Sequence, residues 1–200
     1  MQTVISTKER ILDAALTLFS EKGYDGVGVD LIAANAGLKG PSIYKHFKGK
    51  EEILETVIEQ INRHYEAGFR RNPAVLPASV DELVAISMER IRFTLNDPLI
   101  VKARKLLTLE QFRSPFFAAQ ATAHNYENIQ TMYANMFAGM MEAGTLRRED
   151  PQWLAMLFLS PVTLLIQMHD REPARREEAV QRIEEHLRHF ADVYGIRKAP

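Results

Sequence analysis

The 200-residue sequence is 46% hydrophobic and 26% charged, carries a formal net charge of −1 and contains no cysteine. This composition is typical of a soluble globular protein with one large or two small domains, and it excludes disulfides, thiol nucleophiles and cysteine-bound zinc. The N-terminal residues lack the apolar core of a signal peptide, and the longest apolar run, 153–168, is short for a membrane span and contains Pro161. We therefore expect a cytoplasmic protein without membrane contact.

The first predicted helix begins at Ser6. Ser6 and Glu9 have the S-x-x-E spacing of a capping box, in which each residue satisfies a backbone amide of the other. An apolar stripe with helical spacing follows as far as Lys22, and Gly23 ends it. This helix is expected to brace the two helical segments that come next.

The segment 28–47 has the pattern helix, glycine turn, helix. Apolar residues recur at helical spacing from Val29 to Ala36, and Gly37 stands where a left-handed C-terminal cap belongs. Pro41 lies near the first turn of the second segment, where its missing N–H is harmless. This is the sequence form of a helix-turn-helix.

The second segment carries side chains suited to DNA. Hydroxyl, amine and imidazole groups can donate to phosphate oxygens and base edges. No acidic residue occurs between Leu38 and Lys50 in a chain that is otherwise nearly neutral. A run this short is usually only a solvated helix surface, but its place on a helix-turn-helix favours a docking patch. The candidate DNA-binding residues are Lys39, Ser42, Tyr44, Lys45, His46 and Lys50.

The run AANAGLKGPSIYKHFKGKEEIL, residues 33–54, resembles the DNA-binding module of the TetR (tetracycline-repressor-like) family of bacterial transcription regulators. The resemblance starts near Thr7 and fades after about Arg63. Three helix N-cap positions depart from the family pattern, with glycine at 28 and 49 and lysine at 39. Glycine is a tolerable cap and lysine a poor one, so the second helical segment is expected to start within one or two residues of Lys39.

Beyond this module the pattern stays helical. A long helix is expected from Lys50 to about Arg71, followed by a proline-containing linker at 72–79. Further helices are expected at 80–95, 98–112, 115–143, 151–169 and 174–194, without strands. The predicted fold is all-α with about nine helices, divided into a DNA-binding domain at 5–65 and a ligand-binding and dimerisation domain at 66–200.

The C-terminal part offers an apolar stripe for a ligand pocket. Met132, Met136 and Met140 lie at i, i+4 and i+8, with Tyr133 and Phe137 alongside. Each of these alone is ordinary core, because methionine fills gaps well. The resemblance implies a pocket for a small-molecule effector in this domain. The candidate lining residues are Met88, Arg92, Phe112, Phe116, Asn128, Met132, Tyr133, Met136, Phe137, Met140 and Met156.

The run at 153–168 is apolar nearly all round, so a helix there needs cover on every face. The last helix has one apolar stripe. Two such helices from each of two chains would form a four-helix dimer interface, as the resemblance also implies. The candidate interface residues are Trp153, Leu157, Leu164, Leu165, Met168, Ile183, Leu187 and Phe190.

These features favour a homodimeric regulator that binds double-stranded operator DNA and is released by a small-molecule effector. No cofactor, metal site or enzymatic activity is expected, since no HExxH, GxSxG or P-loop motif occurs. An enzyme with an unrecognised site and a helical protein-binding adaptor remain alternatives, as does activation in place of repression.

Overall fold

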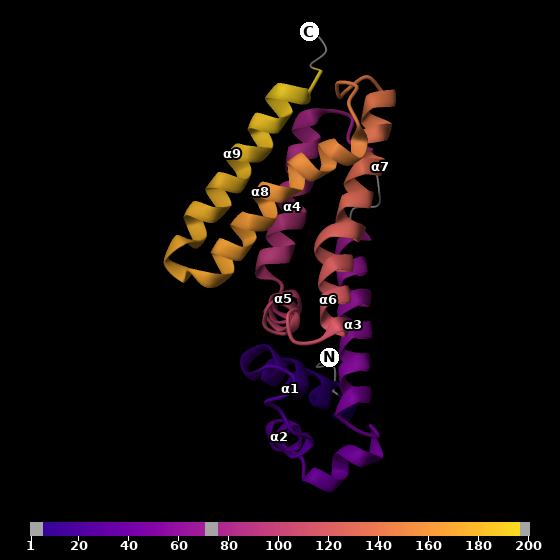
Figure 1. The fold of residues 1–200 in the computed structure, drawn as a ribbon, viewed down its shortest axis with the longest axis vertical. Coiled ribbons are helices and arrows are strands. Elements are labelled where there is room, and N and C mark those ends of the chain that lie inside the picture. The colour runs from indigo at the N-terminus through magenta and orange to yellow at the C-terminus, as the bar shows by residue number, and fades with distance from the viewer. Residues whose placement is uncertain (1–5, 71–75, 197–200) are drawn as a thin grey trace, which may run out of the picture. The chain divides into compact units, whose positions relative to one another are not determined.

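The structure is a computed structural model that describes residues 6–70 and 76–196 (Figure 1). Within these residues the chain forms nine α-helices and no strand, apart from one isolated bridge between Leu146 and Gly195. This confirms the predicted all-α class. The helices are α1 (Thr7–Lys22), α2 (Val29–Asn35), α3 (Lys50–Arg70), α4 (Val80–Asn96), α5 (Pro98–Glu110), α6 (Pro115–Thr122), α7 (Ile129–Glu142), α8 (Pro151–Arg171) and α9 (Arg176–Tyr194), with helical turns η1 (Gly40–Lys45), η2 (Ala123–Asn128) and η3 (Pro173–Arg175).

Several helices begin where the sequence carries a cap. Ser6 Oγ accepts a hydrogen bond from the Glu9 amide at 3.2 Å, and the Glu9 carboxylate accepts one from the Ser6 amide at 2.7 Å. Asp97 caps α5 through the amides of the next turn, and Asp150 caps α8 through the Trp153 amide at 2.8 Å. Because these bonds are local, the helix starts follow from the sequence alone.

Two predicted helices differ from the expected form. The second segment of the helix-turn-helix is the 3₁₀ helix η1, which is only six residues long. The helix expected at 115–143 is divided into α6 and α7 by the π-helical turn η2. Residues 72–75 of the predicted linker at 72–79 lie outside the described residues.

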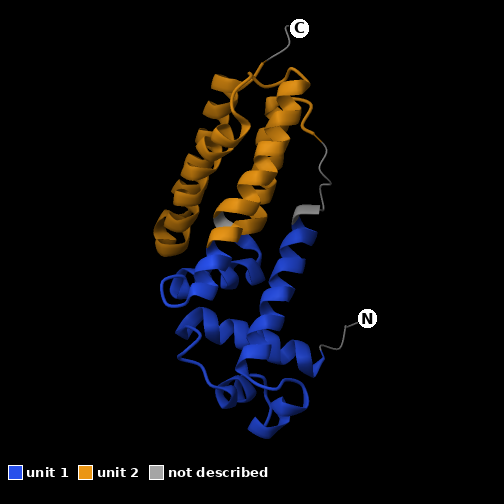
Figure 2. Cartoon of the chain, turned by 45° about the vertical axis from the view of Figure 1, so that its right-hand side comes forward, with its two compact units in different colours: residues 1–71, 96–121 blue, residues 72–95, 122–200 orange. Residues whose placement is uncertain are grey.

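The chain has two compact units, residues 1–71 with 96–121 and residues 72–95 with 122–200 (Figure 2). The core of the first unit contains apolar side chains of α1, α2, η1 and α3, together with Leu106 of α5 and Phe117 of α6. The segment 96–121 therefore packs with the N-terminal helices, although the expected boundary at residue 65 assigned it to the C-terminal domain. That residue 65 separates the DNA-binding function from the ligand-binding function stays a prediction.

Glu110 links α5 to the turn after α1 within this first unit. Its carboxylate is 2% exposed and accepts hydrogen bonds from the Tyr24 amide at 3.1 Å and from Arg113 at 3.2 Å. A Cβ on Gly23 would lie 2.5 Å from the same carboxylate, so the close approach requires glycine there. The turn that leads toward α2 is thus held by a residue from a distant part of the chain.

The second unit is built from α4, α7, α8 and α9 around an aromatic cluster. The rings of Phe137, Phe158 and Phe190 lie between 4.8 and 5.5 Å apart. Tyr133 packs beside them and its hydroxyl hydrogen-bonds Ser87 at 3.2 Å. Burial raises the pKa of this Tyr133 hydroxyl, so it stays protonated. The unit therefore has a continuous apolar core of its own.

Candidate nucleic-acid interface

The turn between α2 and η1 is closed by a glycine in the left-handed conformation. Gly37 has φ +69°, and its amide donates to the Ala34 carbonyl at 3.1 Å. The Leu38 amide donates to the Ala33 carbonyl at 2.8 Å, which completes the pair of bonds of a Schellman motif. This confirms the predicted glycine cap. The direction in which η1 leaves α2 is fixed by these two bonds.

Arg10 of α1 supports the same turn. Its guanidinium donates to the carbonyl of Ala36 and, at 3.5 Å, to that of Gly37. These are carbonyls at the end of α2 that lack helical partners, so a cationic donor is favourable there. The sequence analysis did not single out Arg10, because nothing in its local pattern shows which distant carbonyls it reaches.

The η1 segment places its apolar and polar side chains on opposite sides. Ile43 is fully buried and Phe47, just beyond the segment, is 2% exposed in the core shared with α1 and α3. Tyr44 is 61% exposed, and Lys45 and His46 are exposed beside it. Lys39 is exposed immediately before the segment and Ser42 is half-buried within it. The structure thus brings these five predicted DNA-binding residues together on one short, solvent-facing segment.

Lys50 differs from the other candidates because its ammonium has partners within the unit. Its Nζ donates to the Tyr24 carbonyl at 3.1 Å and lies 4.1 Å from the centre of the Tyr24 ring. Partial burial and the neighbouring Glu51 carboxylate raise the pKa of Tyr24 to about 12, so its hydroxyl is neutral at physiological pH. Lys50 therefore fastens α3 to the turn after α1.

The predicted effector-pocket residues are spread over different environments. Met88, Tyr133, Phe137 and Met140 are at most 5% exposed in the second core, and Met132 and Met136 pack half-buried against it. Arg92, Asn128 and Met156 are exposed. Two cavities of this unit include some of the candidates, one of about 260 Å³ with Met88 and Arg92 and one of about 230 Å³ with Met156. Phe112 and Phe116 belong to the first unit, where they are 91% and 43% exposed.

The predicted interface residues separate into two groups. Trp153, Leu157 and Leu164 on α8 are 56%, 37% and 61% exposed, and Leu165 and Met168 are half-buried. The three α9 candidates, Ile183, Leu187 and Phe190, are at most 3% exposed inside their own chain's core. Among the described helices, α8 alone is long and apolar enough to cross a membrane, but it packs against α7 and α9. Of the predicted interface residues, those left without cover in this chain therefore belong to α8.

Two protein families match the two parts of this sequence. The family described as "Bacterial regulatory proteins, tetR family" matches residues 11–57, and "AefR-like transcriptional repressor, C-terminal domain" matches residues 81–196. The biofilm operon icaADBC negative transcriptional regulator IcaR of Staphylococcus epidermidis is 42% identical over 65 residues, which cover 32% of this chain and 35% of that protein. The match thus spans about a third of the length of that curated relative.

Solved structures are similar over nearly the whole chain. The structure of SmeT, the repressor of the Stenotrophomonas maltophilia multidrug efflux pump SmeDEF, has a TM-score of 0.71 at 22% identity and covers 96% of this chain and 91% of that one. AibR in complex with isovaleryl coenzyme A and operator DNA has a TM-score of 0.62 at 20% identity, covering 81% of this chain and 86% of the other. At these identities the structures share the fold. Together with the family matches to both parts of the sequence, the glycine turn and the exposed η1 segment show that the chain belongs to the TetR family of bacterial transcription regulators.

Proposed function

We propose that this protein is a cytoplasmic, homodimeric repressor that binds operator DNA through η1 and is released by a small-molecule effector. The observation that carries the DNA-binding part is the short segment held by the Gly37 turn, with Tyr44, Lys45 and His46 exposed together. Amine, imidazole and phenol groups in this arrangement can donate to phosphates and to base acceptors in a major groove.

Each candidate has its own role in this proposal. Tyr44, His46 and Ser42 bind backbone phosphates and orient η1, and Lys45 donates to the O6 and N7 acceptors of a guanine. Lys39 and Lys50 add charge next to the phosphates at either end of the segment. Of these residues, only Lys45 is expected to read a base, so its loss should change sequence preference and not affinity alone.

Dimerisation is supported by the exposed apolar face of α8, which includes Trp153, Leu157 and Leu164. A two-fold axis through such a face would pair two η1 segments. They would then read a pseudo-palindrome in successive major grooves, about one helical turn or roughly 34–36 Å apart. A pair of identical half-sites also raises affinity without new contacts within either half.

Effector release is supported by the half-buried methionines of α7. Met132 and Met136 pack half-buried at the margin of the second core, where a flexible thioether can move aside for a ligand. AibR, which shares this fold, is found in complex with both isovaleryl coenzyme A and operator DNA, and this supports a ligand-responsive DNA-binding role for the present protein. An effector would act by binding more tightly to the arrangement that has low operator affinity.

The test begins with selection of a DNA site from a random pool by the full-length protein. Lys45→Ala should then weaken binding to the selected site by about 1–3 kcal/mol and relax preference at one base position. Lys105→Ala is the matched control, because it removes the same charge from an exposed position on α5 of the same unit. Fluorescence anisotropy with the selected duplex measures both. Equal affinities of the two variants for the selected duplex would show that η1 does not recognise the base sequence.

A further inference from the structure

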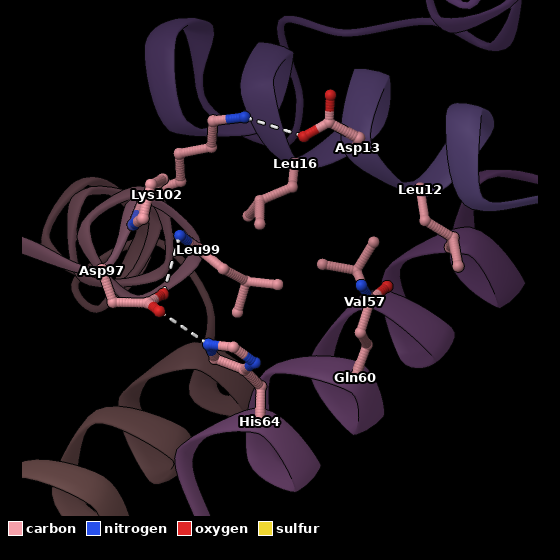
Figure 3. A pocket seen from close by; sticks show the side chains of 10 residues that line it. Leu12, Asp13, Leu16, Val57, Gln60, His64, Asp97, Leu99 and Lys102 are labelled. Atoms are coloured by element: carbon pink, nitrogen blue, oxygen red, sulfur yellow. Dashed lines mark hydrogen bonds and ion pairs between the residues drawn. The ribbon is translucent and has the colours of Figure 1, made fainter. Parts of the chain in front are cut away.

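A cavity of about 240 Å³ lies within the first compact unit, between α1, α3 and the start of α5 (Figure 3). Four apolar side chains from these three helices point toward its centre, namely Leu12, Leu16, Val57 and Leu99. Its volume is sufficient for a molecule with a single ring. The cavity belongs to a different compact unit from the methionines proposed above to bind the effector.

The charged groups around this cavity are paired with one another. Lys102 Nζ lies 2.9 Å from an Asp13 carboxylate oxygen and also donates to Thr17 at 2.8 Å. His64 Nε2 lies 2.8 Å from Asp97 Oδ2, and Asp97 Oδ1 accepts from the amides at the start of α5. A charged ligand would compete with these pairs for its partner, whereas an uncharged ligand would leave them intact. The lining therefore favours an uncharged occupant.

Gln60 supplies the remaining hydrogen-bonding capacity of the lining. Its side chain is half-buried at the edge of the cavity and makes no hydrogen bond to any residue in the described part of the chain. A carboxamide has both a donor and an acceptor to satisfy. A ligand with an adjacent acceptor and donor would satisfy both at once. The chemistry that fits is an apolar ring that carries a carboxamide, a lactam or a similar group.

We propose that this cavity is a binding site for a small uncharged molecule with a ring-sized apolar body and an amide-like donor–acceptor pair directed at Gln60. The apolar body contacts the four aliphatic side chains, and the polar group faces the Gln60 amide. Such a ligand touches α1 and α3, the two helices that flank the helix-turn-helix in the same compact unit. The inference goes beyond the proposed function and does not require it, since binding at this site can be measured without DNA.

Benzamide is the probe, because it combines one ring with a carboxamide. Full-length protein with labelled leucine and valine methyl groups is titrated and followed by NMR. Saturable shifts are expected at the methyls of Leu12, Leu16, Val57 and Leu99, with a dissociation constant on the order of 1 mM for a ligand of this size. Failure of these methyls to shift, or larger shifts in the second unit, would overturn the proposal.

Gln60→Leu tests the polar half of the site. It keeps the side-chain volume and removes both hydrogen bonds, so benzamide affinity should fall about tenfold. Gln111→Leu makes the same change at the C-cap of α5, away from the cavity, and should leave the affinity unchanged. Equal affinities for the two variants would refute the role of Gln60.

Leu99→Trp tests the cavity itself, because a larger side chain there occupies the space. It should abolish the methyl shifts caused by benzamide. The unliganded spectrum of each variant shows that it is folded. If Leu99→Trp does not fold, Gln60→Leu decides the question, since that position is half-buried and its substitution keeps the volume. Retained benzamide binding in a folded Leu99→Trp variant would place the probe elsewhere and overturn the assignment.

Discussion

Gly37→Ala should destabilise the first compact unit by about 2–4 kcal/mol. Gly37 has φ +69°, a conformation that costs an alanine about 1–2 kcal/mol. An added Cβ would also lie 3.0 Å from the Arg10 guanidinium nitrogen that supports the end of α2. If Arg10 moves away, its charged hydrogen bonds to the turn carbonyls weaken, and such bonds contribute about 1.5–3 kcal/mol. The two effects act at one turn and should add in part.

Gly144→Ala is the matched control for the conformational effect. Gly144 has φ +71°, and nothing lies within 4 Å of a Cβ placed there. Its substitution should therefore cost only the conformational part, about 1–2 kcal/mol, and in the second unit. The difference between the destabilisation by Gly37→Ala and that by Gly144→Ala is the contribution of the Arg10 contact.

Urea unfolding can follow the two units separately. The single tryptophan, Trp153, lies in the second unit, so its fluorescence follows that unit and its proposed dimer contact, whereas far-UV circular dichroism reports helices of both units. Gly37→Ala should lower the midpoint of the dichroism transition while leaving the fluorescence transition in place. The double variant Arg10→Ala, Gly37→Ala should be less destabilised than the sum of the single variants, because both act on the same contact. Equal costs for Gly37→Ala and Gly144→Ala, or strict additivity with Arg10→Ala, would refute this account.

Three further predictions concern the dimer face, the effector site and acid stability. Leu164→Glu should yield a folded monomer by light scattering, because Leu164 is 61% exposed. Ile183→Glu should instead unfold the second unit, because Ile183 is fully buried. A dimeric Leu164→Glu variant would show that this face of α8 is not the dimer interface. Met136→Trp should keep the melting temperature within about a degree and abolish the effector response, and a drop of several degrees would indicate overpacked core instead. Partial burial raises the pKa of Asp97, but hydrogen bonds from His64 and the α5 amides outweigh burial and hold the pKa below its ordinary value. The Asp97 carboxylate should therefore add stability above its ordinary pKa, and this stability should be lost as the pH falls through the lowered pKa. Urea midpoints of Asp97→Asn should lack this acid-dependent part, and a parallel pH profile for variant and wild type would contradict it.

The helix content and the turn at Gly37 could be predicted from local pattern. The capping box at Ser6, the caps at Asp97 and Asp150 and the left-handed glycine all involve residues within five positions of one another. The sequence could therefore specify them without knowledge of the fold. The η2 turn was not predicted, because no proline or glycine in 116–128 marks it.

The sequence by itself determined where most helices begin and end and which short segment presents Tyr44, Lys45 and His46, because those outcomes depend on hydrogen bonds and periodicity within a few residues. The tertiary structure alone decided which distant residues meet. It placed the apolar stripe of Ile183 inside its own chain, joined Glu110 to the turn after α1 and tied the Lys50 ammonium to Tyr24. An apolar or charged helix face requires a partner, but its sequence does not specify which segment that partner is. The free energy of burial or pairing is the same for any neighbour of the right chemistry.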